Sequence, residues 1–414
     1  MSYKHLGERM GEKIFEDVKV ADFSWYAVGP AVTRAFAENG AEVVHVESGT
    51  RVDGHRTTPP FSDNERSVNR SGTFAMNNHA KYGMTLNLRH PKGVEVAKRL
   101  VAWADIVTES FTPGTFQRLG LGYEELKIIK PGIILFSTCQ MGQTGPLARY
   151  PGFGTHLTSF TGFVSATGWP DRLPSLIWGP YTDFIGMHSG LLAMAAGIDY
   201  QRRTGIGQHI DLSQYESSVN FTSLALLEYQ ANGREYPRMG NRSPYTAPHG
   251  VYPCRGEERW CAIAVSSEAE WLSFCRVIGK PEWIKEPRFA TLTARKRNED
   301  ELEQSIAECT QDFTAEELMM ALQAAGVSAG VVKNPRDVAE DPQLKYRHYA
   351  WEVEHPEMGK HSLYETNAFR FSETPAEITK PAPCLGEHTY HVCTEILGMS
   401  SEEFAQLLSE GVFE

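Results

Sequence analysis

Several features that mark common classes of protein are missing from this chain of 414 residues. No run of 18 apolar residues occurs, so we expect no membrane-spanning helix. No cluster of His, Cys and acidic residues has the spacing of a metal site, so we expect no metal. Basic residues are in deficit and the net charge is −12, which argues against nucleic acid or an anionic membrane as the main partner.

Disulfide and targeting signals are absent as well. The seven cysteines are scattered, odd in number and without any C-x-x-C pair. This usage is typical of free thiols in a reducing compartment. The stretch 1–13 is polar and charged, unlike a signal peptide. These observations predict a cytoplasmic protein.

The first half of the chain alternates between strand-like and helix-like segments. Strands are expected at 18–23, 41–47, 106–109 and 133–138, and helices at 31–39, 91–104 and 123–130. This alternation predicts an α/β fold with a parallel sheet. No G-x-G-x-x-G follows the first strand, so a dinucleotide is not expected.

The length predicts about two domains. Residues 1–220 form the first part of a large domain, the Gly- and Pro-rich stretch 221–250 a linker, and 251–331 a smaller α+β domain. Within the smaller domain we expect strands at 251–254, 260–265 and 327–331, and helices at 268–277, 300–309 and 314–325. A second linker is expected at 332–365. Strand-like pieces occur at 349–353 and 368–371, and residues 366–414, with a helical tail at 390–408, are expected to rejoin the large domain.

Asp183 stands in an unusual setting, among apolar and aromatic residues directly after Gly179-Pro180. Burying such a carboxylate without compensation is unfavourable. Apolar residues at helical spacing follow over 191–198, so Asp183 is expected near a helix N-terminus. Two interpretations are open at this point. One is a helix cap, and the other is a carboxylate nucleophile that attacks an activated carbonyl.

Five stretches, taken together, resemble one family. They are Asp22-Phe23 with Gly29-Pro30, Glu109 to Gly114 with Arg118-Leu119-Gly120, Asp183 with Arg203 to Gln208, Gly326 to Gly330 with Asp341 to Leu344, and Pro383 to Thr389. In order and spacing they are similar to the class III coenzyme A transferases, the family of formyl-CoA and carnitine CoA-transferases. The resemblance favours the nucleophile, because Asp183 falls at the catalytic aspartate of that family.

The resemblance also implies the fold and the partners. It implies a large doubly wound domain made from both chain ends, a smaller domain in the middle, and two subunits threaded as interlocked rings. The substrates would be coenzyme A thioesters and carboxylic acids, with no prosthetic group. The assembly would be a homodimer or a hetero-oligomer with a homologous subunit.

The family match assigns further residues to coenzyme A. It places Lys81, Arg118 and Arg149 as basic contacts and Phe111 at the adenine side; Tyr26, Ala27 and Ser110 complete the expected set. The chain departs from the formyl-CoA transferases where Trp25-Tyr26-Ala27 replaces a His-Val-Gln run. Ser48 stands in place of an adenine-contacting arginine, for which Arg51 is a nearby substitute.

The acid substrate is suggested by bulky and basic side chains. Trp25, Tyr26, Phe153 and Tyr181 are the expected pocket residues and favour an apolar or aromatic acid. Arg51, Arg56, Arg70 and His55 could hold a second carboxylate. Both features fit an aromatic-substituted succinate, as in the benzylsuccinate CoA-transferases of aromatic acid catabolism, with succinyl-CoA as donor.

Two alternatives remain at the level of sequence. An α-methylacyl-CoA racemase would share the fold but needs a His and an Asp as acid and base. Its histidine position falls on Phe153, and His156 is displaced by three residues. A non-catalytic CoA-binding subunit is the other alternative, and Asp183 argues against it because such a subunit needs no buried carboxylate.

Overall fold

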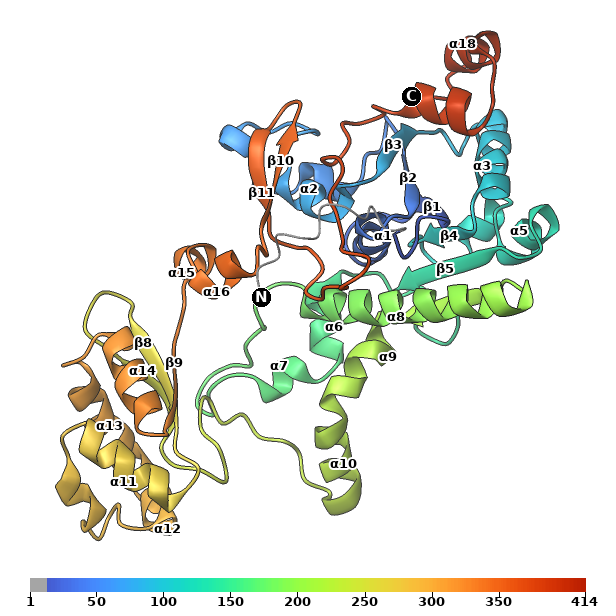
Figure 1. The fold of residues 1–414 in the computed structure, drawn as a ribbon. Helices are drawn as coiled ribbons and strands as arrows, with labels where there is room; N and C mark the ends of the chain where they lie inside the picture. The colour runs from blue at the N-terminus through green and yellow to red at the C-terminus, as the bar shows by residue number, and fades with distance from the viewer. Residues whose placement is uncertain (1–12) are drawn as a thin grey trace. The chain divides into compact units, whose positions relative to one another are not determined.

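The computed structural model describes residues 13–414, which divide into two units (Figure 1). The larger unit comprises 13–163, 176–234 and 345–414, and the smaller unit comprises 164–175 and 235–344. The larger unit therefore contains chain from both sides of the smaller one. Every residue that the family resemblance assigned to coenzyme A lies in the larger unit.

A six-stranded sheet organises the larger unit. All neighbouring strands are parallel, in the order β3-β2-β1-β4-β5-β6. The strands are β1 (Lys19–Phe23), β2 (Glu42–Glu47), β3 (Tyr82–Thr85), β4 (Ile106–Glu109), β5 (Ile134–Cys139) and β6 (His209–Ser213). The order reverses between β1 and β4, and in open parallel sheets ligands bind beyond the carboxyl ends of the strands at such a point.

Helices cover both faces of this sheet because alternate strand residues are apolar on both sides. Val20 and Ile106 face a core that includes Phe36 of α1. Their neighbours Ala21 and Val107 face the other core, which contains residues of α3 and of the C-terminal segment. The sheet is thus doubly wound, as expected, and its strands read as continuous apolar runs because both faces are buried.

The helices of the larger unit vary widely in length. They are α1 (Val28–Glu38), α2 (Gly72–Asn78), α3 (Pro91–Trp103), α4 (Thr115–Arg118), α5 (Tyr123–Ile129), α6 (Gly154–Phe160), α8 (Tyr181–Thr204), α9 (Gln214–Val219), α10 (Ser223–Asn232), α17 (Thr389–His391) and α18 (Ser401–Ser409). A π-helical turn (Val392–Ile396) lies between the last two. Figure 1 shows α18 beside α3, where Arg99 and Glu403 form an ion pair of 2.7 Å.

The smaller unit is α+β. Its antiparallel sheet has the order β7-β8-β9, with β7 (His249–Pro253), β8 (Trp260–Ala264) and β9 (Ser328–Val331). Its helices are α11 (Glu268–Val277), α12 (Leu292–Arg297), α13 (Glu299–Thr310), α14 (Ala315–Ala324) and α15 (Pro335–Ala339). Thr314 and Glu317 form a capping box at the start of α14. Helices α7 (Phe163–Ala166) and α16 (Pro342–Tyr346) lie where the chain passes from one unit to the other.

Several expectations about the linkers were wrong. Helix α10 occupies part of the expected linker 221–250. The hairpin of β10 (Trp351–His355) and β11 (Gly359–Leu363) occupies part of the expected linker 332–365. No strand forms over 368–371, and the smaller unit also takes in residues 164–175.

Candidate active site

A cavity of about 1080 Å³ lies in the larger unit, large enough for a cofactor-sized ligand. Its lining comes mainly from the segments that follow β1, β2, β3, β4 and β5, together with residues 148–154 and the first turn of α8. The cavity is therefore found at the carboxyl ends of parallel strands and at the reversal point between β1 and β4.

Asp183 lies on the wall of this cavity, in the first turn of α8. The residue before the helix is Pro180, and no side chain caps this helix end. Within the described residues, no hydrogen bond or ion pair joins the Asp183 carboxylate to another group. Burial raises its pKa to about 7. The structure therefore does not support the helix-cap interpretation.

The first residue of α6 lies directly against this carboxylate. A Cβ atom at Gly154 would come within 2.7 Å of the Asp183 carboxylate atoms, so a side chain there would displace the carboxylate. The hydroxyl of Thr182 donates to the Gly154 carbonyl at 3.0 Å and ties the start of α8 to the start of α6. Asp183 is thus fixed by its neighbours in the backbone, while its carboxylate lines the cavity.

Two aromatic side chains, Tyr26 and Phe153, form what we call the aromatic wall. Their rings meet edge to face at 5.5 Å, and both line the cavity. They are 41% and 58% exposed, so both rings are accessible to a ligand in the cavity. Phe153 directly precedes Gly154, so the aromatic wall adjoins Asp183.

The residues after β4 form another part of the lining. Ser110 Oγ accepts a hydrogen bond from the Trp25 backbone N–H at 2.9 Å. The ring of Phe111 lies 6.1 Å from that of Trp25. Glu109 shapes this turn, because its carboxylate accepts the Phe111 N–H at 2.8 Å, and burial raises the pKa of Glu109 to about 7. Trp25, Ala27, Ser110 and Phe111, all expected site residues, therefore line one cavity.

Positive charge reaches the cavity from three arginines. Arg51, Arg89 and Arg149 all line it and are exposed. None of the three forms an ion pair with any residue in the described part of the chain. Unpaired guanidinium groups suit phosphate, so these arginines allow the cavity to hold an anionic ligand.

Lys81 corrects one expectation. It is fully buried, and its ammonium donates to Asp22, to the Pro30 carbonyl and to Asn78 at 2.9–3.0 Å. All three of its donors are used, and it does not line the cavity. This placement does not support a contact with coenzyme A.

Two further expected site residues lie outside the cavity lining. Arg118 donates to Thr115 at 2.8 Å beside the cavity. Tyr181 packs edge to face on Phe163 at 5.4 Å. Neither side chain contributes to the cavity in this conformation.

Three of the four basic residues expected to hold a second carboxylate are already engaged. Arg56 is buried and ion-paired to Glu47 at 2.7 Å. Arg70 pairs with two surface acids, Asp63 and Glu65. Burial lowers the pKa of His55 to about 4 and leaves it neutral. Only Arg51 of that group remains available to a ligand.

Some residues of the cavity lining were not predicted from the sequence. Arg89, Gln140, Gly154 and Gln214 line the cavity but belong to no motif that points to a ligand. A glycine or glutamine far along the chain gives no signal of its own, since only the fold brings it near Asp183.

The residues needed for acid–base racemisation are not together. No histidine lines the cavity in the described part of the protein. The position expected for a catalytic histidine holds Phe153, and His156 is exposed outside the lining. Across residues 13–414, no three His, Cys, Asp or Glu side chains are arranged to hold a metal ion. No helix there is long and apolar enough to cross a membrane.

The chain is similar to known proteins over most of its length. A model of CoA-transferase family III matches residues 15–389. The crystal structure of a CAIB/BAIF family protein from Brucella suis shares 30% identity and a TM-score of 0.85, covering 93% of this chain and 100% of that one.

Two curated relatives match nearly the whole chain. Probable CoA-transferase Rv1866 of Mycobacterium tuberculosis is 33% identical over 98% of this chain, which spans about half (51%) of that relative's length. Succinyl-CoA–D-citramalate CoA-transferase of Chloroflexus aurantiacus is 31% identical, over 96% of this chain and 97% of that protein.

Proposed function

This protein belongs to CoA-transferase family III, and we propose that it transfers coenzyme A between carboxylic acids with Asp183 as a covalent nucleophile. One observation carries the proposal. The Asp183 carboxylate lies on the wall of a cofactor-sized cavity without a partner among the described residues. Near neutral pH, with a pKa of about 7, a large share of it is ionised and able to attack.

The reaction divides into two symmetrical halves. The carboxylate attacks the acyl carbon of the donor thioester, the C–S bond breaks, and a mixed anhydride and CoA thiolate form. The thiolate attacks the Asp183 carbonyl, giving an aspartyl-CoA thioester and releasing the donor acid. The acceptor carboxylate then attacks this thioester, forms a second anhydride and expels the thiolate. Attack of that thiolate on the acceptor carbonyl yields the new acyl-CoA and restores Asp183.

Coenzyme A is proposed to bind in this cavity with its phosphates on the unpaired arginines of the lining. Arg51, Arg89 and Arg149 would hold its phosphates, since each is exposed on the lining without an ion pair in the described chain. Phe111 and Trp25 would pack against the adenine side. The arginines compensate locally for the chain's overall charge of −12, which would repel a polyanion.

The proposed acceptor is an aromatic-substituted succinate, and the proposed donor is succinyl-CoA. The exposed rings of the aromatic wall supply an apolar surface next to Asp183. The Chloroflexus relative is named for succinyl-CoA and citramalate, both of which carry the succinate or substituted-succinate skeleton.

The proposed assembly is a dimer, with an identical or a homologous subunit. Helix α10 exposes large apolar side chains, among them Leu224 (79%), Leu227 (58%) and Tyr229 (59%). Exposed apolar side chains in this number on one helix are typical of a surface that another protein covers. Size measurement in solution distinguishes a monomer from a dimer.

Mass spectrometry of the intact protein tests the covalent step. The protein is mixed with succinyl-CoA, trapped with hydroxylamine or borohydride, and mapped by peptide digestion. We expect a modification at Asp183 that Asp183→Ala does not acquire. Asp199→Asn is the matched control, because Asp199 lies on the same helix in an exposed ion pair with Arg203.

The possible outcomes separate the rival functions. A trapped adduct at Asp183 in wild type and in Asp199→Asn supports the covalent mechanism. An adduct that persists in Asp183→Ala contradicts it. Exchange of the α-proton in deuterated water without any adduct would instead favour a racemase.

A further inference from the structure

Tyr26 has a backbone conformation that side chains rarely adopt. Its φ is +66°, in the left-handed region, although it is not glycine. Tyrosine holds such a conformation only where its surroundings impose it, and strained residues of this kind concentrate at functional sites. Tyr26 also lines the cavity, in the loop between β1 and α1.

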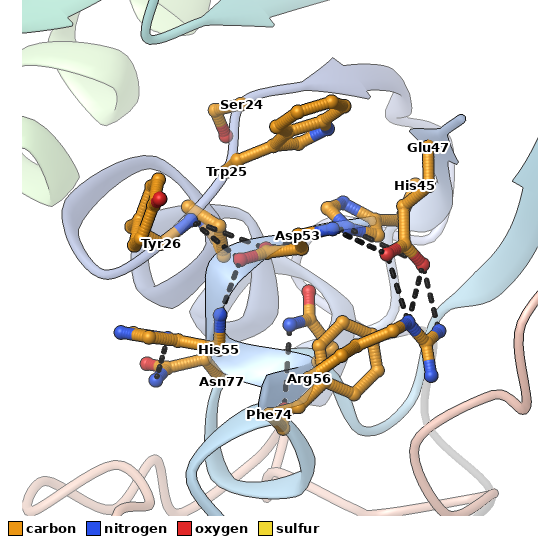
Figure 2. Close-up of polar contacts among 12 residues, drawn as sticks. Ser24, Trp25, Tyr26, His45, Glu47, Asp53, His55, Arg56, Phe74 and Asn77 are labelled. Atoms are coloured by element: carbon orange, nitrogen blue, oxygen red, sulfur yellow. Dashed lines mark hydrogen bonds and ion pairs between the residues drawn. The ribbon is translucent and has the colours of Figure 1, made fainter. Parts of the chain in front are cut away.

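Asp53 binds the backbone of Tyr26 directly. Both of its carboxylate oxygens lie 3.1 Å from the Tyr26 backbone N–H (Figure 2). The same carboxylate accepts the His55 N–H at 2.9 Å, which caps the short turn Gly54–Thr57. That cap is local, whereas the contact with Tyr26 joins two loops that are 27 residues apart. An ordinary cap does not require the second contact.

Asp53 is surrounded by other polar groups. Asp53 is fully buried, and its backbone N–H donates to Glu47 at 3.2 Å. His45 Nε2 approaches its carboxylate at 3.9 Å. Burial raises the pKa of Asp53 to about 6. Because this value still lies below neutral pH, most of the carboxylate that accepts the Tyr26 N–H is ionised at pH 7.

The ring of Tyr26 packs against Gly54, His55 and Phe153. A Cβ atom at Gly54 would lie 2.2 Å from Tyr26 Cε1, so only glycine leaves room for the ring. The His55 ring meets it edge to face at 5.7 Å, and Asn77 holds His55 by a hydrogen bond of 3.3 Å (Figure 2). The ring also contacts Phe153, edge to face at 5.5 Å.

The contacts of Tyr26 lead through Phe153 to the Asp183 carboxylate. Phe153 is followed by Gly154, whose Cα lies so near Asp183 that an added Cβ would collide with it. A shift of Tyr26 therefore moves the surface that an acid meets as it approaches Asp183. A displacement of about 1 Å at such a surface can change a rate by about a hundredfold.

We propose that Asp53 is a positioning residue that sets acid specificity by holding Tyr26 in its left-handed conformation and so fixing the aromatic wall. This inference rests on the proposed function, since it assumes that the acid attacks at Asp183. The favoured substrates are acids with an aromatic or bulky apolar substituent, because the wall presents the edges of two rings. Small acids make little contact with the wall and depend on it less.

A double-mutant cycle tests the role of Asp53. In Asp53→Asn, the amide still accepts one N–H, but its own NH2 group opposes the other. Glycine at position 26 reaches a φ of +66° unaided and carries no ring. The four proteins are therefore wild type, Asp53→Asn, Tyr26→Gly and the double variant, assayed with succinyl-CoA as donor and with acetate, methylsuccinate and phenylsuccinate as acceptors.

The expected result is a loss of discrimination. We expect Asp53→Asn to lower kcat/KM for phenylsuccinate, relative to methylsuccinate, by about ten- to a hundredfold, with the KM of succinyl-CoA little changed. In the Tyr26→Gly background, the same substitution should change the ratio by less than about twofold. A change of equal size in both backgrounds, or an unchanged ratio in Asp53→Asn, would overturn the inference.

Controls separate this inference from the proposed function. Asp341→Asn is the matched variant, because Asp341 accepts the N–H groups of Gln343 and Leu344 at 2.8 and 2.9 Å in the smaller unit. It should leave the ratio unchanged. If wild type gives no adduct at Asp183, the proposed function fails. If the adduct forms but Asp53→Asn leaves the ratio of kcat/KM values unchanged, only the role proposed for Asp53 is wrong.

Discussion

At the scale of the residue, Asp183 is a group whose placement disfavours the folded state. Its pKa is about 7 in the folded protein against an ordinary value of 3.8, because burial penalises the charged form. Below pH 3.8 the residue is protonated in both states. As the pH rises from 3.8 to 7, the unfolded chain ionises first, so stability falls across this window and the loss is complete above pH 7.

Asp183→Asn removes this titration. We expect the variant to exceed wild type in free energy of unfolding by about 1–3 kcal/mol at pH 8, and the difference to shrink towards pH 4. Urea denaturation at the two pH values measures it. Asp199→Asn, at an exposed ion pair, should differ from wild type by less than about 0.5 kcal/mol. A destabilised Asp183→Asn at pH 8 would indicate a structural carboxylate.

At the scale of the element, a buried polar network holds the carboxyl ends of β1 and β2. Asp22 accepts from Lys81 and from the hydroxyls of Thr33 and Thr108, and lies 3.2 Å from His45. Burial alone would raise the pKa of Asp22, but Lys81 and His45 hold it well below its usual range. The network thus fixes the strand ends from which the cavity lining departs.

Lys81→Met leaves the Asp22 carboxylate buried without its cation. We expect a loss of about 3–5 kcal/mol in unfolding free energy, with the KM for acyl-CoA within about twofold of wild type. Arg149→Gln should do the opposite, with unchanged stability and a KM raised by about tenfold. Urea denaturation and steady-state kinetics measure both. A Lys81→Met protein with unchanged stability and a raised KM would indicate that Lys81 contacts coenzyme A after all.

The elements also show how far a sequence can be interpreted. Strands β1, β2, β4 and β5 were predicted because both faces of each are buried, which leaves a continuous apolar run. β3 and β6 were missed, since Tyr82–Thr85 contains a glycine and His209–Ser213 mixes polar with apolar residues. Helix α10 was assigned to a linker because Gly and Pro punctuate the chain just after it.

The site was predictable to a similar degree. Asp183, Trp25, Tyr26, Phe111 and Phe153 were expected and line one cavity. The burial of Lys81 could not be foreseen, because a lysine's identity does not reveal that its partner is Asp22, 59 residues away. The contact between Asp53 and Tyr26 was beyond reach for the same reason, since it depends on the packing of two loops.

At the scale of the whole molecule, the cavity belongs to one of the two units. Every lining residue falls between Phe23 and Gln214, within the larger unit. The smaller unit has its own apolar core, which includes Trp271, Phe274 and Leu318. Ligand binding to the native cavity should therefore stabilise the two units unequally.

Hydrogen exchange with and without coenzyme A tests this inequality. At a ligand concentration of about 100 times Kd, native-state stabilisation reaches about 2.7 kcal/mol. We expect the slowed amides to lie in 24–29, 47–51, 86–89, 110–119 and 138–154, the segments that line the cavity. Amides of β7, β8 and β9 should exchange at the same rate in both conditions, because no lining residue comes from that sheet. Pantetheine, which lacks the phosphates, is the control and should protect the segment 47–51 less. Equal protection across 249–331 would show instead that the smaller unit takes part in binding coenzyme A.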